Sequence, residues 1–273
     1  MSAPALSIVF PCFNEAGRLP HTLERYLASF PEDPAAVEFV IVDDGSTDST
    51  FAVAEKTATR DPRVRVLPSE PNRGKGFAVR TGVLSAEGEL VVFTDADGSY
   101  GPEQVQRVVR ALERAPVAIG SRMATSETVE GRAAPPGAPA GSTGATAAEP
   151  VVRGLGPALR RAASRVFNAA MRLALDLPFQ DTQCGLKGFR RDAGRALFGR
   201  ARMDGFAFDA EILFLARRLG YEVLEVPVRA TDRDGSKVRL AIDAIRMLGE
   251  VWSVRRAAGR GVYDQTRVRD HAG

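Results

Sequence analysis

Residues 90–98 read LVVFTDADG, and this stretch decides the fold. The run Leu90–Thr94 is apolar or β-branched throughout, so it predicts a strand buried on both faces, as strands of parallel sheets are. Asp95 and Asp97 follow it directly, and Gly98 allows the chain to turn there. Ligands of α/β proteins bind beyond the carboxyl ends of such strands, so this turn is the first candidate binding site.

The same alternation of short apolar runs and helical patterns extends over the first 120 residues. The predicted strands are Leu6–Phe10, Phe39–Val42, Val64–Leu67, Leu90–Thr94 and Val117–Ile119. The predicted helices are Arg18–Phe30, Ser46–Thr59, Lys75–Ser85 and Pro102–Arg114. Alternating strands and helices predict an α/β fold with a mostly parallel sheet and helices on both faces.

The second half of the chain continues this domain after an interruption. Residues 124–150 are rich in Ala, Gly, Pro, Ser and Thr, which predicts a flexible inserted loop. Beyond it we expect the helix Gly156–Leu175, the strand Gly185–Arg190, the helix Asp209–Leu219, the strand Val223–Val228 and the helix Val238–Arg256. The prediction is one domain over residues 1–257 with a C-terminal amphipathic helix, followed by a disordered tail over residues 258–273.

Composition narrows the classes of function. Of 273 residues, 44% are hydrophobic and 26% are charged, which is ordinary for a globular domain. Two cysteines argue against a disulfide framework, and with only two histidines we expect no histidine acid–base chemistry. Neither a signal peptide nor an apolar run long enough to span a bilayer is recognisable, so we expect a cytoplasmic location.

Charge is unevenly placed along the chain. Acidic residues outnumber basic ones over residues 1–115, and basic residues are in excess over residues 116–273. This separation suits a metal together with an anionic partner or a membrane surface, and an Arg-rich solvated exterior would look the same. Nothing in the pattern indicates a nucleic-acid partner.

The pair Asp95 and Asp97 is a candidate metal site. Residues two apart in an extended segment lie on one face, so both carboxylates can meet one cation. Hard oxygen ligands favour Mg²⁺ or Mn²⁺, with diphosphate and water filling the remaining positions. Such an ion would stabilise a departing nucleotide diphosphate. Taken alone, the pattern also fits an ordinary surface turn.

Polar residues follow two other predicted strands. Asp43 and Asp44 follow one strand and could accept hydrogen bonds from a nucleoside, or they could belong to a solvated turn in which Ser46 or Thr47 caps the next helix. After the first strand come Phe13, Asn14 and Glu15, of which the two polar residues could also meet a base, whereas Phe13 could be core.

A basic, Gly-rich loop, Asn72-Arg73-Gly74-Lys75-Gly76, opens a predicted helix. Helix N-terminal N–H groups together with Arg73 and Lys75 suit a phosphate, although a solvated basic turn would have the same composition. The loop is not a Walker motif, and the dinucleotide pattern GxGxxG is absent. NTP hydrolysis and NAD chemistry are therefore disfavoured.

Six motifs in order carry a resemblance to a known family. They are PCFNE (11–15), VDDGSTDST (42–50), NRGKGFAVRTG (72–82), TDADGSY (94–100), GSR (120–122) and DTQCGLKGF (181–189). Together they resemble the inverting family-2 glycosyltransferases, which have the GT-A fold. Among these the chain is most similar to the dolichyl-phosphate β-glucosyltransferases and related polyprenyl-phosphate enzymes. The resemblance covers roughly residues 5–257.

The resemblance implies roles for individual residues. The metal ligands would be Asp95 and Asp97, with Asp97 in catalysis. The donor-binding set would be Pro11, Phe13, Asn14, Glu15, Asp43, Asp44, Lys75, Asp95 and Ala96. The acceptor-phosphate set would be Arg122, Arg160, Ser164, Arg233, Ser236 and Lys237. The sequence departs from the family in lacking a recognisable membrane anchor and in having Gly205-Phe206-Ala207-Phe208-Asp209 where relatives carry a Trp.

The acceptor distinguishes the candidate functions. A lipid phosphate is already anionic and needs arginines to position it, whereas a hydroxyl acceptor would need a carboxylate base such as Asp181 or Asp209. We favour transfer of a hexose, glucose from UDP-glucose before mannose from GDP-mannose, to a polyprenyl phosphate at a membrane surface, with Arg122 in catalysis. The alternatives are a soluble enzyme that glycosylates a hydroxyl and, less favoured, an inactive sugar-nucleotide-binding protein.

Overall fold

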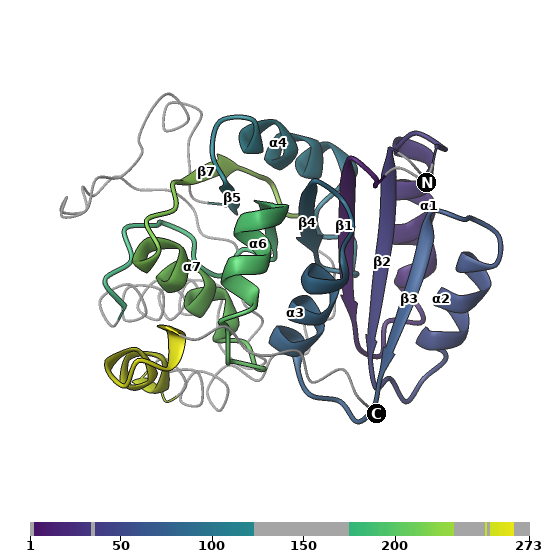
Figure 1. Ribbon diagram of the computed structural model, residues 1–273. Coiled ribbons are helices and arrows are strands. Elements are labelled where there is room, and N and C mark those ends of the chain that lie inside the picture. Colours follow the sequence, from purple (N-terminus) through teal and green to yellow (C-terminus); the bar gives the residue numbers. More distant parts are fainter. Residues whose placement is uncertain (1–2, 34–35, 123–174, 232–248, 250–251, 265–273) are drawn as a thin grey trace, which may run out of the picture.

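The computed structural model describes residues 3–33, 36–122, 175–231, 249 and 252–264. Its centre is a seven-stranded sheet with the strand order β3-β2-β1-β4-β6-β5-β7 (Figure 1). The strands are β1 (Leu6–Cys12), β2 (Val37–Asp44), β3 (Val64–Ser69), β4 (Leu90–Thr94), β5 (Val117–Ser121), β6 (Leu186–Arg190) and β7 (Val223–Pro227). Only β6 runs antiparallel to its neighbours β4 and β5 among the described strands, so the predicted mostly parallel sheet is confirmed.

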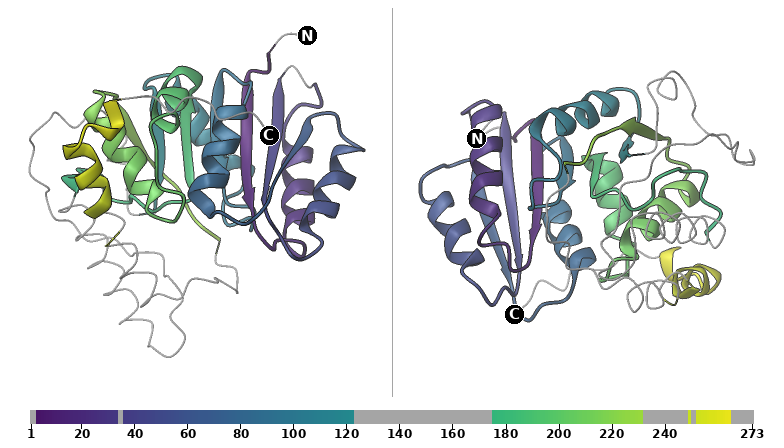
Figure 2. Two further views of the ribbon diagram at one scale, coloured as in Figure 1. Left: turned by 60° about the horizontal axis from the view of Figure 1, so that its bottom comes forward. Right: turned by 180° about the vertical axis from the view of Figure 1, so that it is seen from behind.

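Helices cover both faces of this sheet, as Figure 1 and the view from behind in Figure 2 show. They are α1 (Leu19–Ser29), α2 (Thr50–Ala58), α3 (Lys75–Ser85), α4 (Pro102–Leu112), α6 (Arg191–Phe198) and α7 (Phe208–Arg218). Strand residues alternate between the two layers, because successive side chains point to opposite faces. Val9 of β1 belongs to the core layer that includes residues of α3, α6 and α7, whereas Ile8 and Phe10 belong to the opposite layer with residues of α1 and α4.

Two local expectations were wrong. The helix predicted from Ser46 begins at Thr50, because residues 45–49 form a loop and the carboxylate of Asp48 accepts the Thr50 N–H at 2.9 Å. Helix α6 was not predicted at all. It has eight residues and starts directly after β6, with no Gly, Pro or capping residue between them to mark the boundary.

The predicted elements of the second half are tested only in part. The loop 124–150, the helix Gly156–Leu175 and most of the helix Val238–Arg256 lie outside the described residues, although residues 252–259 are helical. Within the part of the chain that the structure describes, no helix is long and apolar enough to span a bilayer.

The predicted disordered tail is wrong for its first seven residues, 258–264. A short 3₁₀ helix, η2 (Val262–Asp264), packs Tyr263 into the core under α7. The Tyr263 hydroxyl donates to Oε1 of the buried Glu211 at 2.7 Å, and Arg218 pairs with Asp264 at 3.0 Å. One buried aromatic side chain is enough to order a segment whose composition is otherwise polar, because its burial offsets the lost chain entropy.

Replacing Tyr263 with phenylalanine is expected to lower the free energy of unfolding by about 1–2 kcal/mol, since it removes one hydrogen bond to a buried carboxylate. Urea unfolding followed by circular dichroism measures the change. Tyr221→Phe is the matched control, because Tyr221 is only partly buried at the edge of the same core. Equal stability of Tyr263→Phe and wild type would show that the segment 262–264 contributes nothing through this bond.

Candidate active site

The parallel strands β1, β2, β4 and β5 end at one edge of the sheet, and the predicted motif residues lie at those ends or just beyond them. Since β1 pairs with both β2 and β4, the turns after these three strands are neighbours. The antiparallel β6 begins at this edge, so residues 181–185 enter the site from the other direction. Segments far apart in the sequence are thereby brought to one place.

Lys75 and Asp95 form the centre of the site. Lys75 is the first residue of α3, and its Nζ lies 2.6 Å from Oδ1 of Asp95. Burial by itself would lower the pKa of Lys75, but the carboxylates of Asp95 and Asp209 outweigh it and raise the pKa above its ordinary value. Lys75 is therefore a fixed positive charge at a helix N-terminus, an arrangement suited to phosphate.

Asp95 is confined by a glycine that the sequence analysis did not single out. A Cβ on Gly185 would lie 2.0 Å from Oδ2 of Asp95, so no larger residue fits there without displacing the carboxylate. Asp97 is held differently, since its Oδ1 accepts the N–H of Ser99 at 2.9 Å. Both carboxylates thus have defined positions at the end of β4, whereas the intervening Ala96 is buried.

The carboxylate oxygens at this edge of the sheet fit a divalent cation that binds together with a diphosphate. Among the described residues, no group of three or more His, Cys, Asp or Glu side chains is placed to hold a metal ion. Asp95 and Asp97 offer two carboxylates, and Mg²⁺ is usually bound by one or two carboxylates plus substrate phosphates and water. In the described part of the chain, these two carboxylates are therefore the proposed protein ligands, and substrate phosphates and water would fill the other positions.

The loops after β1 and β2 support each other. Asn14 lies in the left-handed region with a φ of 56°, and its Oδ1 accepts the Thr47 N–H at 2.8 Å. Its own N–H donates to Oγ of Ser46 at 2.9 Å, and Ser46 in turn donates to Asp43. Asn14 thus ties the two loops together, and Asp43 lies almost buried beneath them.

Asp44 holds the basic loop. Its carboxylate accepts the N–H groups of Gly74 at 2.7 Å and Arg73 at 3.1 Å, and the side-chain amide of Asn72 at 2.9 Å. Burial raises the pKa of Asp44, although the hydrogen bonds from Arg73 and Gly74 oppose the shift. The role of Asp44 in a nucleoside pocket stays a prediction, and in the structure its side chain binds the loop that leads to Lys75.

The other residues near the end of β1 that are predicted to bind the nucleotide-sugar donor differ in their solvent exposure. Glu15 pairs with Arg18 within the first turn before α1, and its N–H donates to Oγ1 of Thr50 at 2.7 Å. Pro11 is half-buried at the end of β1, and Phe13 is exposed. The exposed ring of Phe13 shows that it is not a core residue, which leaves it available for contact with a ligand.

Arg122 follows β5 and is held by Asp181. Its Nε and Nη2 donate to the two carboxylate oxygens of Asp181 at 2.7 and 2.9 Å, and its backbone N–H adds a third bond at 3.0 Å. Asp181 is fully buried, whereas the Arg122 side chain remains 24% exposed. A bidentate pair of this kind fixes the plane of the guanidinium, so Arg122 presents its outer edge in one orientation.

Neither candidate base is a free carboxylate. Burial alone would raise the pKa of Asp181, but the hydrogen bonds and charge of Arg122 bring it below its ordinary value. Asp209, in the first turn of α7, accepts from the fully buried Lys187 at 2.5 Å. Both carboxylates are therefore tied to a cation, which suits the orientation of other groups better than proton abstraction from a substrate.

The remaining acceptor candidates, Arg160, Ser164, Arg233, Ser236 and Lys237, lie outside the described residues. The last described residue before Arg233 is Thr231, and its N–H donates to the Ser99 carbonyl at 2.8 Å. Thr231 thus lies directly beside the Asp95–Ser99 turn.

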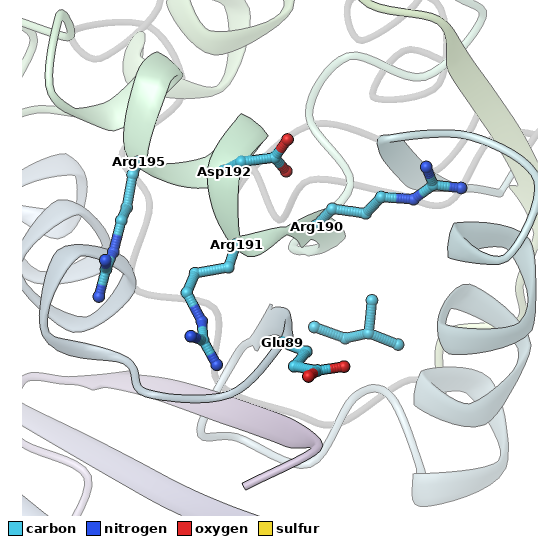
Figure 3. Close-up of a pocket in the computed structure, with 6 residues that line it drawn as sticks. Glu89, Arg190, Arg191, Asp192 and Arg195 are labelled. Carbon is cyan, nitrogen blue, oxygen red and sulfur yellow. The ribbon is translucent and has the colours of Figure 1, made fainter. Parts of the chain in front are cut away.

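A hollow of about 630 Å³ lies at the opposite edge of the sheet, between the start of β4 and the end of β6 (Figure 3). Two of the arginines that line it form hydrogen bonds to backbone carbonyls. Arg190 donates to the Leu112 carbonyl at 2.9 Å, and Arg191 donates to the Gly88 carbonyl at 2.7 Å. Arg195 is exposed. None of the motif residues lines this hollow, so it is not the candidate active site.

Comparison with known proteins agrees with the geometry. The family model "Glycosyl transferase family 2" matches residues 7–198. The chain is 33% identical over 264 residues to a dolichyl-phosphate beta-glucosyltransferase of Saccharomyces cerevisiae, covering 94% of this chain and 76% of the relative. It is 30% identical over 248 residues to the Homo sapiens protein of the same name, covering 85% and 69%.

Solved structures share the fold at lower identity. A glucosyl-3-phosphoglycerate synthase from Mycobacterium tuberculosis, solved with phosphoglyceric acid, has a TM-score of 0.63 at 18% identity, covering 92% of this chain and 80% of that one. A mannosyl-3-phosphoglycerate synthase from Rubrobacter xylanophilus has a TM-score of 0.60 at 17% identity, covering 99% and 78%. The fold is that of the GT-A glycosyltransferases, and the chain is a glycosyltransferase that belongs to glycosyl transferase family 2.

Proposed function

We propose that this enzyme transfers glucose from UDP-glucose to a polyprenyl or dolichyl phosphate and inverts the anomeric configuration. The observation that carries the proposal is the Arg122–Asp181 pair, which lies at the same edge of the sheet as Lys75 and Asp95. It supplies an oriented cation for an anionic acceptor, whereas both candidate bases are engaged by cations. The names of the relatives at 33% and 30% identity support the same donor sugar and acceptor.

On the donor side, Asp95 and Asp97 would hold Mg²⁺ or Mn²⁺ and Lys75 would lie against the diphosphate. Solved structures of similar fold hold UDP with Mn²⁺ or Mg²⁺, which supports a divalent ion here. When bound, such an ion stabilises the negative charge of the leaving nucleotide diphosphate. Lys75 adds a second fixed positive charge, and the bonds of Asp44 to the 72–74 loop keep α3 in place beneath it.

On the acceptor side, Arg122 would hold the lipid phosphate. The acceptor and the donor diphosphate repel each other, so a fixed guanidinium is needed to make their approach favourable. Direct attack of a phosphate oxygen on the anomeric carbon forms one bond as the bond to the diphosphate breaks. An α-linked donor therefore gives a β-linked product, and no proton has to be removed from the nucleophile.

A lipid acceptor requires the enzyme to act at a membrane surface. We propose peripheral attachment at the inner face of the cell membrane. Residues 252–259 support this, because Trp252 is 76% exposed on that helix and Arg255 and Arg256 are exposed beside it. Aromatic and basic side chains together are typical of helices that bind anionic lipid interfaces.

A hydroxyl acceptor is the second candidate, and the fold similarity to enzymes named for phosphoglycerate supports it. One experiment separates the two. The protein is incubated with Mn²⁺ and radiolabelled UDP-glucose or GDP-mannose, with either a polyprenyl phosphate or phosphoglyceric acid as acceptor. Label from UDP-glucose in the organic phase, dependent on the lipid, supports the proposal. Label only in a water-soluble product would overturn it.

UDP is expected to stabilise the protein against heat in the presence of Mn²⁺, because a ligand that binds only the folded state shifts unfolding by mass action. At a concentration about a hundredfold above its Kd, the midpoint should rise by roughly 5–10 °C. Differential scanning fluorimetry with UDP and with GDP measures this. A clear rise with GDP and none with UDP would favour mannose from GDP-mannose as the donor sugar.

A further inference from the structure

Glu225 of β7 holds the chain segment that carries Asp181. Its carboxylate accepts the N–H of Gln180 at 2.9 Å through Oε1 and at 3.1 Å through Oε2, and Oε1 also accepts the N–H of Asp181 at 3.2 Å. Glu225 lies 44 residues beyond Asp181 in the sequence. One carboxylate from a distant strand therefore fixes two successive peptides of a segment that is neither helix nor strand.

The register of the sheet explains why Glu225 meets this segment. Glu225 is in register with Ile119 of β5, and Ile119 is in register with Lys187 of β6. Side chains in register on neighbouring strands point to the same face, so Glu225 lies on the face that Ile119 and Lys187 share. Phe179 belongs to the same core cluster as Ile119, so the chain crosses this face just before it reaches Gln180.

The position of the Arg122 guanidinium depends on the backbone of Asp181. The Asp181 side chain is short and fully buried, so its carboxylate follows its own backbone. That carboxylate accepts Nε, Nη2 and the backbone N–H of Arg122 at 2.7, 2.9 and 3.0 Å. A shift of the Asp181 peptide would therefore turn the guanidinium, because the bidentate pair moves as one unit.

The other end of the segment is held by different contacts. The Cys184 carbonyl accepts Nζ of Lys187 at 2.7 Å, and the residue after Cys184 lies against the carboxylate of Asp95. These contacts are on the donor side of the proposed site, whereas Glu225 acts on the acceptor side. Loss of the Glu225 carboxylate is therefore expected to disturb Arg122 and to leave Asp95 in place.

We propose that Glu225 is a positioning residue of the acceptor site. By holding the peptides of Gln180 and Asp181, it fixes the carboxylate that orients Arg122 toward an anionic acceptor. Such a role affects the rate because a displacement of about 1 Å, even one caused far from the reacting atoms, can slow a reaction roughly a hundredfold. The inference rests on the role of Arg122 in the proposed function.

A direct test observes the guanidinium by nuclear magnetic resonance. In ¹⁵N-labelled protein, the Nε–H signal of Arg122 is identified by its loss in Arg122→Ala. Glu225→Gln places an NH₂ group where an oxygen accepted an N–H, so exchange of the Arg122 Nε–H with water should become roughly tenfold faster, the effect of one lost hydrogen bond. Glu222→Gln is the matched control, because Glu222 is exposed just before β7 and should leave this exchange unchanged.

Transfer of glucose gives an independent measurement. Glu225→Gln is expected to lower kcat/KM for polyprenyl phosphate roughly tenfold, while UDP with Mn²⁺ still raises the unfolding midpoint as in wild type. Adding Glu225→Gln to Arg122→Ala should cause no further loss, because Glu225 acts through Arg122. A general structural role would instead weaken donor binding and add to the effect of Arg122→Ala.

Glu225→Asp is a second variant, in case the glutamine variant folds poorly. It keeps the charge in a side chain that is one CH₂ group shorter, so it should also speed exchange of the Arg122 Nε–H. Unchanged exchange in both variants would overturn the inference, as would losses of transfer that multiply in the double variant. If Arg122→Ala transfers glucose to polyprenyl phosphate normally, the proposed function fails instead, and faster Nε–H exchange in the Glu225 variants still supports the hold of Glu225 on Arg122.

Discussion

Replacing Asp97 with alanine is expected to lower the turnover number by about a thousandfold or more while the protein stays folded. The carboxylate lies just beyond the end of β4, next to Asp95. Loss of one of the two proposed protein ligands would remove most of the charge stabilisation that the metal gives the leaving diphosphate. Transfer of radiolabelled glucose to polyprenyl phosphate measures the loss.

Removal of the metal should have the same effect as the substitution. Excess EDTA is expected to abolish transfer by wild type, and Mg²⁺ or Mn²⁺ should restore it. Arg195→Ala is the control variant, because Arg195 is exposed on α6 at the other edge of the sheet and should leave activity unchanged. Asp97→Ala should keep the circular dichroism spectrum of wild type. Full activity in excess EDTA would show that the Asp95–Asp97 pair does not act through a metal.

Local signals explain what could be predicted from the sequence. Strand β4 and the start of α3 lie where predicted, because an unbroken apolar run and a Gly-rich helix start are set by neighbouring residues. The approximate position of the site could be predicted because ligands of α/β proteins bind beyond the carboxyl ends of the parallel strands. Helix α6 left no such signal, because it begins where a strand ends without an intervening break.

The partners of individual side chains could not be predicted, because they depend on contacts between distant segments. Asp44 bonds to residues about thirty positions away, and nothing near it in the sequence indicates that it anchors the 72–74 loop. The buried lysine of the DTQCGLKGF motif likewise looks like a surface residue until β6 places it between β4 and α7. The tail was misjudged because a single residue, Tyr263, orders it.

Arg122→Ala is expected to lower transfer to polyprenyl phosphate by roughly a thousandfold while donor binding and slow hydrolysis of UDP-glucose persist. The side chain is held by Asp181 at the end of β5, on the acceptor side of the proposed site, so its loss should affect the nucleophile and not the nucleotide. Separate measurements of lipid-linked product, free glucose and UDP binding distinguish these effects.

Asp181→Asn is expected to cause a smaller loss of transfer, roughly tenfold. Asparagine keeps the shape and one acceptor oxygen for Arg122 but loses the charge that fixes the guanidinium. Because Asp181 acts through Arg122, the double variant should be no worse than Arg122→Ala alone. The two losses would multiply if the residues acted independently.

The reverse pattern would favour a hydroxyl acceptor. A base must take a proton in the transition state, so Asp181→Asn would then be inactive even with Arg122 intact. The structure argues against that role, since Arg122 keeps the pKa of Asp181 below its ordinary value and a carboxylate of low pKa is a weak base. For the same reason, Asp181 should stay ionised throughout the neutral range, and kcat/KM for the lipid should show no titration of this residue there. Inactive Asp181→Asn beside an active Arg122→Ala would identify the acceptor as a hydroxyl and overturn the lipid-phosphate proposal.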